Sequence, residues 1–367
     1  MRYKLLTPGP LTTTDTVKRE MMIDHCTWDD DYKSVTQKIR AGLLKLAHVS
    51  EEEYTSVLIQ GSGTFGVEAA ITTLVGEDDY LLILANGAYG ERMADIAHHA
   101  GISYHMRSWA IDEQPDAQTV KMILQENKSI THVAMVHSET TSGILNDVQS
   151  IGRVVKEAGA TFIVDAMSSF AGVDIPVREW GIDCIISSAN KCIQGVPGFA
   201  YVIVRKDLLA ACEGNARSLA LDLWKTMNVD GKWRFTSPTH VVLAFAKAME
   251  ELEAEGGITA RHERYAANEK LLRKKLSALG FVPFLEQEVQ GPIITTFYYP
   301  AGYNFSFQEM YDYIKERGYI LYPGKTTKAE TFRVGNIGEI YQDDIDKVAG
   351  LLSDFLDSKR NLQAKGA

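Results

Sequence analysis

The sequence has few cysteines and no pattern that would put them to use. Its 367 residues include only Cys26, Cys184, Cys192 and Cys212, with no Cys-x-x-Cys pair and no Cys/His spacing typical of a zinc site. Neither a structural metal nor a disulfide framework is therefore predicted. We expect a reducing, cytoplasmic setting in which these thiols stay free.

Long apolar runs and surplus positive charge are also absent. No apolar stretch reaches the roughly 18 residues of a membrane span, and Pro8 and Pro10 interrupt the N-terminal segment, which does not resemble a secretory signal. The formal net charge is -10. This charge argues against nucleic acid or an acidic membrane as a partner, because no basic surplus exists to neutralise phosphates. Any anion site must therefore be local.

What remains is an ordinary globular composition, with 45% apolar and 23% charged residues and no internal repeat. Strand and helix patterns alternate from residue 54 to residue 136, with a helix near 117–126 and a strand at 132–136, which predicts a mostly parallel sheet of the α/β class. From about Gly256 a long charged helix, short strands and a final helix at 343–356 predict a smaller α+β part. We expect an N-terminal arm at 1–15, a large domain at 16–255 and a small domain at 256–367.

Two short apolar runs, at residues 162–164 and 184–186, have the length and β-branched content of buried parallel strands. Asp165 follows the first run directly, and Lys191 lies a few residues beyond the second. Ligands of open α/β sheets bind outside the carboxyl ends of the strands. The spacing therefore predicts that both side chains lie at this edge of the sheet.

Asp165 and Lys191 are the two groups that pyridoxal phosphate chemistry requires. A carboxylate beside an aromatic ring nitrogen keeps that nitrogen protonated, and a lysine that loses its proton can form a Schiff base with an aldehyde. Each residue also has a plainer interpretation, a turn cap for Asp165 and a solvated charge for Lys191. The small, charge-poor residues around Lys191 favour the neutral amine.

Three further segments could contribute to such a site. Residues 61–64, Gly-Ser-Gly-Thr, connect a predicted strand at 54–60 to a helix and could bind a phosphate, although the same residues make ordinary turns. Tyr89 could stack on a planar ring or be one more half-buried aromatic residue. Thr140 could donate to a phenolic oxygen or cap a turn.

Three charged or proline-rich features each have two interpretations. Arg333 interrupts an apolar strand, so it forms either a structural ion pair or a fork that holds a substrate anion. Residues 5–11 form a rigid arm that either tethers the N-terminus or lines a site. The acidic run at 29–31 begins a helix, with a metal site as the alternative.

Taken together, these motifs resemble the fold type I, class V pyridoxal phosphate aminotransferases. The resemblance rests on Asp165, on Lys191 within residues 187–200, on the Gly-rich turn at 61–64, on residues 86–90 and on residues 332–335. Further stretches at 26–32, 137–143 and 231–240 resemble the branch that transfers the amino group of 2-aminoethylphosphonate to pyruvate. The family resemblance implies a large domain with a mostly parallel sheet of seven strands and a small C-terminal α+β domain.

The resemblance also implies a role for each motif residue. Lys191 would bond covalently to the cofactor and move a proton, and Asp165 would pair with the pyridinium nitrogen. Arg333 would hold the substrate phosphonate and carboxylate in turn. The remaining cofactor contacts would come from Ser62, Gly63 and Thr64 at the phosphate, Tyr89 on the ring, Thr140 at the phenolic oxygen, and Thr236 from the second subunit of a homodimer.

The implied activity is a ping-pong transfer that yields phosphonoacetaldehyde and L-alanine, a step of phosphonate degradation. The nearest alternative is an alanine– or serine–glyoxylate enzyme of the same class, but those carry Trp where this chain has Tyr89. A desulfurase would need a mobile nucleophilic cysteine, and Cys192, the cysteine nearest to Lys191, is expected to be a packed small hydrophobe.

Overall fold

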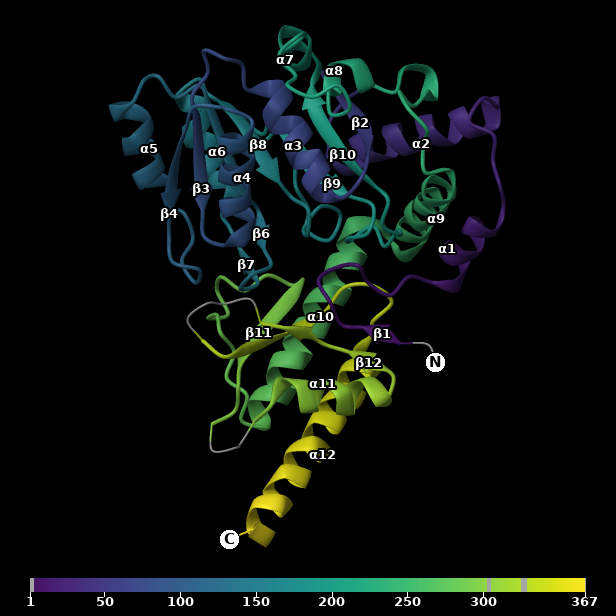
Figure 1. Ribbon diagram of the computed structural model, residues 1–367, viewed down its shortest axis with the longest axis vertical. Coiled ribbons are helices and arrows are strands. Elements are labelled where there is room, and N and C mark those ends of the chain that lie inside the picture. The colour runs from purple at the N-terminus through teal and green to yellow at the C-terminus, as the bar shows by residue number, and fades with distance from the viewer. Residues whose placement is uncertain (1–2, 302–304, 325–328, 367) are drawn as a thin grey trace.

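A seven-stranded sheet forms the centre of the larger part of the molecule (Figure 1). This computed structural model describes residues 3–301, 305–324 and 329–366. Six strands of the sheet are parallel, and β10 alone runs antiparallel, between β2 and β9. In spatial order the strands are β2 (Tyr54–Gln60), β10 (Phe199–Arg205), β9 (Cys184–Ser188), β8 (Thr161–Asp165), β5 (His132–Val136), β3 (Leu81–Ala85) and β4 (Tyr104–Ser108).

Helices cover both faces of this sheet because its strands are apolar on both faces. Along β3, Leu82 and Leu84 pack into one core, whereas Leu81 and Ile83 pack into another. The first core is closed by α2 (Asp30–Leu46), α5 (Ala117–Glu126), α6 (Val148–Glu157) and α9 (Thr239–Glu255). The second is closed by α3 (Gly63–Leu74), α4 (Ala88–His99), α7 (Lys206–Ala211) and α8 (Leu223–Thr226). The result is a three-layer α/β arrangement, which confirms the predicted fold class.

Most predicted elements of this part are confirmed. The strands expected at 54–60 and 132–136 and the helix expected at 117–126 have the predicted bounds. The strand β10 and the helix α6 were not predicted. The strands β8, β9 and β10 follow one another without a helix between them, so alternation gives no signal for an antiparallel strand there.

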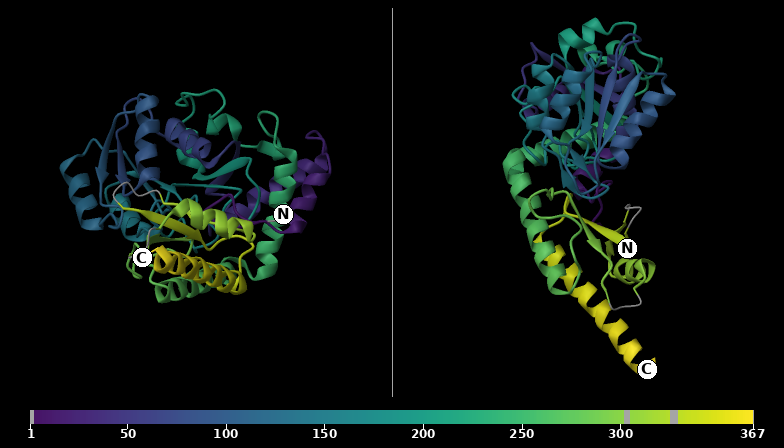
Figure 2. Two further views of the ribbon diagram at one scale, coloured as in Figure 1. Left: turned by 60° about the horizontal axis from the view of Figure 1, so that its bottom comes forward. Right: turned by 90° about the vertical axis from the view of Figure 1, so that its left-hand side faces the viewer.

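The C-terminal part has its own three-stranded antiparallel sheet, in the order β11-β14-β13, and its own hydrophobic core. Figure 2 shows α10 running along one side of both parts and α12 extending from the bottom. The final helix is about ten residues longer than the predicted 343–356. The elements are α10 (Gly257–Ala278), β11 (Ile294–Tyr298), α11 (Phe307–Glu316), β12 (Tyr319–Ile320), β13 (Tyr322–Pro323), β14 (Thr331–Gly335) and α12 (Gln342–Gly366).

The N-terminal segment joins the C-terminal part before it reaches the large sheet. Its strand β1 (Lys4–Leu5) pairs in parallel with β12, and the chain then continues to α1 (Asp15–Arg19) and to a 3-10 turn, η1 (Glu20–Met22). A second such turn is η2 (Val229–Gly231), and β6 (Ser138–Glu139) pairs with β7 (Ile144–Leu145). Across the described ranges, no helix is long and apolar enough to cross a membrane.

We propose that these two parts correspond to the domains 16–255 and 256–367, with the arm 1–15 between them. The proposed boundary falls at Gly256, which has a left-handed backbone conformation and separates α9 from α10. Each part has a separate core, as expected of a domain. Residues 1–2, 302–304, 325–328 and 367 of these ranges lie outside the described residues.

Packing between α6 and the sheet yields a prediction about stability. A Cβ atom on Gly152 would lie 1.9 Å from the carbonyl oxygen of Trp180. Gly152→Ala should therefore lower the free energy of unfolding by about 1–3 kcal/mol, a typical cost of overpacking. Urea denaturation followed by circular dichroism measures this change.

Gly350 in α12 provides the matched control, because a Cβ there meets no atom within 4 Å. Gly350→Ala should raise the free energy of unfolding by about 0.5–1 kcal/mol, the difference in helix propensity between the two residues. Equal effects of the two substitutions would contradict the packing described for α6.

Candidate active site

A pocket of about 170 Å³ lies at the carboxyl ends of the parallel strands. It brings together residues that are as much as 129 positions apart in the sequence, from Ser62 to Lys191. Six predicted residues line it, namely Ser62, Gly63, Thr64, Tyr89, Asp165 and Lys191. The other lining residues are Val67, Arg92, Met167, Ser188 and Asn190. The edge of the sheet expected for ligand binding is therefore where these side chains meet.

One end of the pocket is the N-terminus of α3. Ser62 is the N-cap residue, yet its side chain makes no capping hydrogen bond, so the first N–H groups of the helix keep their donor capacity. A helix N-terminus with free donors and nearby hydroxyl groups favours an anion. The Gly-Ser-Gly-Thr turn thus has the local structure of a phosphate site.

Arg92 is a pocket residue that sequence reasoning did not identify. It extends from α4, its Nη1 lies 3.4 Å from Thr64 Oγ1, and its guanidinium lies 5.0 Å from the centre of the Tyr89 ring. Tyr89 and Arg92 are three residues apart on one helix, so they share a face. The three-residue spacing from Tyr89 was the signal in the sequence that could have identified Arg92. Arg92 adds a cation to the anion-binding end of the pocket.

Asp165 and Lys191 both carry buried charges at the other end. Burial raises the pKa of the Asp165 carboxyl to about 6, and a hydrogen bond from the Met167 N–H to Oδ1 at 2.8 Å partly opposes this. Burial also lowers the pKa of the Lys191 amine to about 8. At pH 7 about a tenth of Lys191 is therefore already a neutral amine, the form that acts as a nucleophile.

A tight turn sets the position of Lys191 after β9. The N–H of Gln194 donates to the carbonyl oxygen of Lys191 at 2.7 Å, and Gln194 has a φ of 68°. The Lys191 Nζ donates to the carbonyl oxygen of Pro8 at 2.9 Å. Cys192, next in the chain, is fully buried, and burial raises the pKa of its thiol to about 12. Such a thiol is not an activated nucleophile, as the sequence led us to expect.

Arg333 is a buried cation beside the pocket, on β14. Its Nε donates to the carbonyl oxygen of Pro323 at 2.9 Å, and its Nη1 donates to that of Thr140 at 2.7 Å. Within the described ranges, no carboxylate lies within ion-pair distance of it. Its charge also lowers the pKa of Lys191, so the two cations are close enough to interact. Of the two interpretations of Arg333, the contacts favour the anion-binding one.

Glu139 organises the residues around Tyr89, and it was not singled out in the sequence. Its buried carboxylate accepts hydrogen bonds from the N–H groups of Tyr89 at 3.1 Å and Thr141 at 3.0 Å. It thereby caps α4 in place of Gly87, which has no side chain to do so. Thr140 lies between Glu139 and Thr141, so the hydrogen bond between these two residues also restrains Thr140. One carboxylate therefore links the Tyr89 and Thr140 segments.

Besides Thr140 and Arg333, which are not among the lining residues, two more predicted features lie outside this pocket. Thr236 is exposed and does not line the pocket of its own chain. Asp29 is the N-cap residue of α2, and Asp30 and Asp31 lie in its first turn, so the helix-start interpretation of this acidic run is confirmed.

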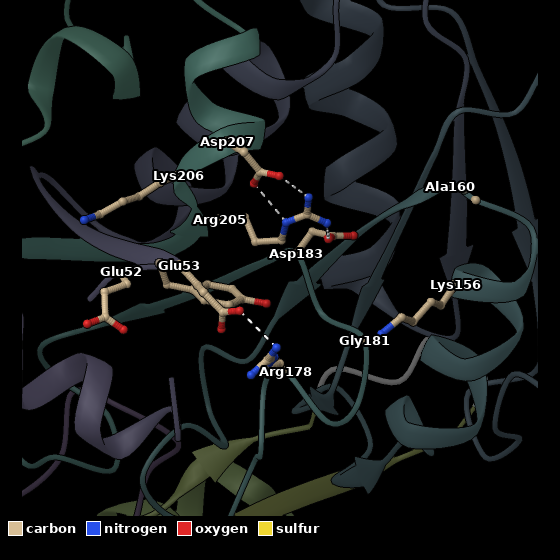
Figure 3. A pocket seen from close by; sticks show the side chains of 12 residues that line it. Glu52, Glu53, Lys156, Ala160, Arg178, Gly181, Asp183, Arg205, Lys206 and Asp207 are labelled. Carbon is tan, nitrogen blue, oxygen red and sulfur yellow. Dashed lines mark hydrogen bonds and ion pairs between the residues drawn. The ribbon is translucent and has the colours of Figure 1, made fainter. Parts of the chain in front are cut away.

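A larger hollow of about 560 Å³ lies elsewhere and has a different character (Figure 3). It lies near the opposite ends of the strands, beside the starts of β2, β8 and β9. Its charges pair with one another. Arg178 contacts Glu53 at 3.0 Å, and Arg205 contacts both Asp183 and Asp207. A ligand would have to displace these pairs, so we do not assign the hollow as a site.

Comparison with known proteins assigns this fold and site to a family. The model of the family described as aminotransferase class-V matches residues 25–333. The 2-aminoethylphosphonate–pyruvate transaminase of Lysinibacillus sphaericus is 56% identical over 362 residues, which cover 98% of this chain and 99% of that protein. The chain belongs to the class V aminotransferase family.

Solved structures agree on the fold. Ureidoglycine–glyoxylate aminotransferase from Bacillus subtilis superposes with a TM-score of 0.90 at 23% identity, covering 98% of this chain and 94% of that one. A pyridoxal phosphate-bound phosphoserine aminotransferase from Trichomonas vaginalis gives 0.75 at 17% identity, covering 95% and 99%. The fold type I prediction is thereby confirmed.

The electrostatics of the pocket predict how Lys191 titrates. Its reactivity towards an amine-directed acylating reagent should rise as pH increases through about 8, because the pKa of the amine is lowered from 10.5 by burial. Mass spectrometry of the peptide that contains Lys191 measures the modified fraction at each pH.

An Asp165→Asn variant tests the sign of the interaction between the two residues. The Asp165 charge raises the pKa of Lys191, so its removal should shift the midpoint to lower pH. A midpoint near 10.5 in the unmodified protein, or an upward shift in the variant, would contradict the described burial and pairing.

Proposed function

We propose that this protein is an aminotransferase that transfers the amino group of 2-aminoethylphosphonate to pyruvate, producing phosphonoacetaldehyde and L-alanine with pyridoxal phosphate as cofactor. The observation that carries this proposal is that Lys191 and a buried Asp165 line one pocket, with a buried Arg333 close enough to lower the pKa of Lys191. The high identity to the L. sphaericus transaminase supports the phosphonate as amino donor over the glyoxylate-type alternative. The reaction belongs to phosphonate degradation.

The donors present in the pocket fit pyridoxal phosphate. The uncapped start of α3, with Ser62, Gly63, Thr64 and Arg92, would bind the phosphate. Tyr89 would stack on the ring, and the Thr140 hydroxyl would donate to the phenolic oxygen. When bound, the cofactor withdraws electrons from the carbon that carries the amino group.

Asp165 is suited to hold a protonated ring nitrogen. Its carboxyl is buried and its pKa is raised to about 6 because burial leaves the negative charge incompletely compensated. A cationic N–H beside it would supply that compensation and would keep Asp165 ionised at neutral pH. The residue therefore favours the protonated state of the ring through a charge-assisted hydrogen bond.

Lys191 would hold the cofactor covalently when no amine substrate is present, and it would move the proton when one is. A lowered pKa of about 8 lets the amine accept a proton from the carbon of the donor and release it again near neutral pH. The side chain is half-buried in the pocket wall, which limits its contact with water.

Arg333 binds the anionic group of each substrate in turn. Its Nε and Nη1 are held by the carbonyl oxygens of Pro323 and Thr140, so the guanidinium plane is fixed before a substrate arrives. Phosphonate and carboxylate both present paired oxygens to such a fork. One cation serving both anions requires the substrates to bind in alternation, as in a ping-pong reaction.

The protein acts as a homodimer in the cytoplasm, with the active site at the subunit interface. Exposed apolar residues support an interaction surface where they gather. Six that are more than half exposed come from two segments of the chain, namely Met22, Ile23, Trp28, Leu219, Val229 and Phe235. Leu219 precedes α8, and Val229 lies in η2. The helix α8 packs on α3, and η2 packs on α2. Thr236, next to the exposed Phe235, would donate to the phosphate bound by the other subunit.

The role of Arg333 predicts a change in affinity for both substrates. Arg333→Ala should raise the apparent KM for 2-aminoethylphosphonate and for pyruvate by roughly 30- to 150-fold, the equivalent of about 2–3 kcal/mol for a charge-assisted pair. Steady-state kinetics with each substrate varied in turn measures the effect. Arg317→Ala, which removes an arginine at the end of α11, is the control. An effect on one substrate only would mean that the other anion binds elsewhere.

The shared site predicts complementation between two defective subunits. Thr236→Val should weaken cofactor binding by about tenfold through loss of a hydrogen bond to the phosphate, and Lys191→Ala should abolish turnover. Mixed dimers of the two variants contain one site with an intact Lys191 and an intact Thr236. At low cofactor concentration they should therefore regain activity that neither parent shows, and a mixture that regains none would refute the sharing of Thr236.

A further inference from the structure

The apex of the N-terminal arm contacts the side chain of Lys191. The Lys191 Nζ donates a hydrogen bond to the carbonyl oxygen of Pro8 at 2.9 Å. Gly9, the next residue, has a φ of +117°, and a Cβ atom there would lie 2.7 Å from Lys191 Cδ and 2.9 Å from Nζ. The lysine side chain therefore occupies the space that any other residue at position 9 would fill.

Backbone hydrogen bonds on both sides of the apex hold the arm in place. The N–H of Leu6 donates to the carbonyl oxygen of Ile320 at 2.9 Å, and the N–H of Gly335 donates to that of Leu6 at 2.8 Å. After the apex, the N–H of Glu339 donates to the carbonyl oxygen of Thr12 at 2.8 Å. Leu6, Thr7 and Leu11 are buried. Figure 1 shows the arm between the C-terminal part and the large sheet.

These anchors attach the arm to the strand of Arg333. Gly335 is two residues beyond Arg333 on β14, and a Cβ atom there would lie 2.4 Å from the carbonyl oxygen of Thr7. The apex thus projects from the C-terminal part, whereas Lys191 belongs to the large sheet. One continuous segment therefore contacts both the anion-binding strand and the reactive lysine.

A free lysine side chain has four rotatable bonds, so its amine needs an acceptor to hold one position. Asp165 and Arg333 change the pKa of the amine through their charges. Within the described residues, the hydrogen bond that Nζ makes is the one to the carbonyl oxygen of Pro8. Donating one N–H to this carbonyl constrains where the rest of the amine points. A main-chain carbonyl is suited to orienting the amine because it accepts hydrogen bonds and does not change its protonation state with pH.

We propose that the Pro8–Gly9 apex is a positioning element that seats the Lys191 amine whenever it is not covalently engaged. The inference rests on the proposed role of Lys191. Gly9 is required at this place because its missing side chain leaves room for the lysine. The carbonyl of Pro8 supplies the acceptor.

The test compares binding of the two forms of the cofactor to the full-length protein. The aldehyde form, pyridoxal phosphate, can bond to Lys191, whereas the amino form, pyridoxamine phosphate, occupies the same pocket without that bond. Gly9→Ala should weaken equilibrium binding of the aldehyde form by about tenfold, because the added Cβ atom would overlap Lys191 Cδ and Nζ and displace the side chain from the position in which it meets the aldehyde. Binding of the amino form should change by less than about threefold and also reports that the variant is folded. Calorimetric titration measures both.

Matched variants separate the possible causes. Gly214→Ala places alanine at a φ of +90° where nothing lies within 4 Å, so it reproduces backbone strain without contact with Lys191, and both affinities should stay unchanged. Thr7→Val removes the hydroxyl that donates to the carbonyl oxygen of Pro10 and should shift the same ratio more weakly. Lys191→Ala sets the ratio expected when the covalent bond is lost.

Each outcome has a definite meaning. Equal weakening of both forms by Gly9→Ala, or no weakening of the aldehyde form, would overturn the positioning role while Lys191→Ala still lowered the affinity for the aldehyde form. A Lys191→Ala variant that bound both forms as tightly as the unmodified protein would instead overturn the proposed role of Lys191. A selective loss in Gly9→Ala, absent in Gly214→Ala, supports the inference.

Discussion

The burial of the Lys191 amine is the constraint on which the rest of the site depends. An ammonium group loses much of its hydration in this position, so its pKa falls to about 8 and the neutral form becomes available. The groups around Lys191 must then accommodate both the protonated and the neutral amine. Asp165 stabilises the charged form electrostatically, the carbonyl of Pro8 accepts a hydrogen bond from either form, and Arg333 opposes the charge. This balance suits one lysine to both proposed roles, nucleophile and proton carrier.

The fold supplies these groups from distant parts of the chain. The strands β8 and β9 end side by side, so Asp165 and Lys191 meet at one edge of the sheet. The start of α3 adds uncapped donors, and α4, capped by the buried Glu139, adds Tyr89 and Arg92. The arm and β14 approach from the C-terminal part and bring Pro8 and Arg333. The site thus lies where both parts of the molecule and the arm converge.

Much of this arrangement could be predicted from the sequence because it depends on short-range patterns. Apolar runs ending at Asp165 and before Lys191 indicated strand ends, and glycine-rich turns indicated the start of α3. The hydrogen bond from the Tyr89 N–H to Glu139 and the contact between Lys191 and Pro8 could not be predicted, since they join segments 50 and 183 residues apart. Arg92 was missed because a helical arginine usually faces solvent. The antiparallel β10 follows β9 through a loop, a connection that the alternation of strands and helices does not predict.

The most direct test of the account uses the protein loaded with pyridoxal phosphate and one substrate at a time. Adding 2-aminoethylphosphonate alone should bleach the visible absorption of the bound cofactor, and later addition of pyruvate should restore it with formation of one alanine per site. That result would establish both half-reactions and the substrate pair. An unchanged spectrum with the phosphonate, together with bleaching by alanine or serine in exchange with glyoxylate, would contradict the proposed amino donor.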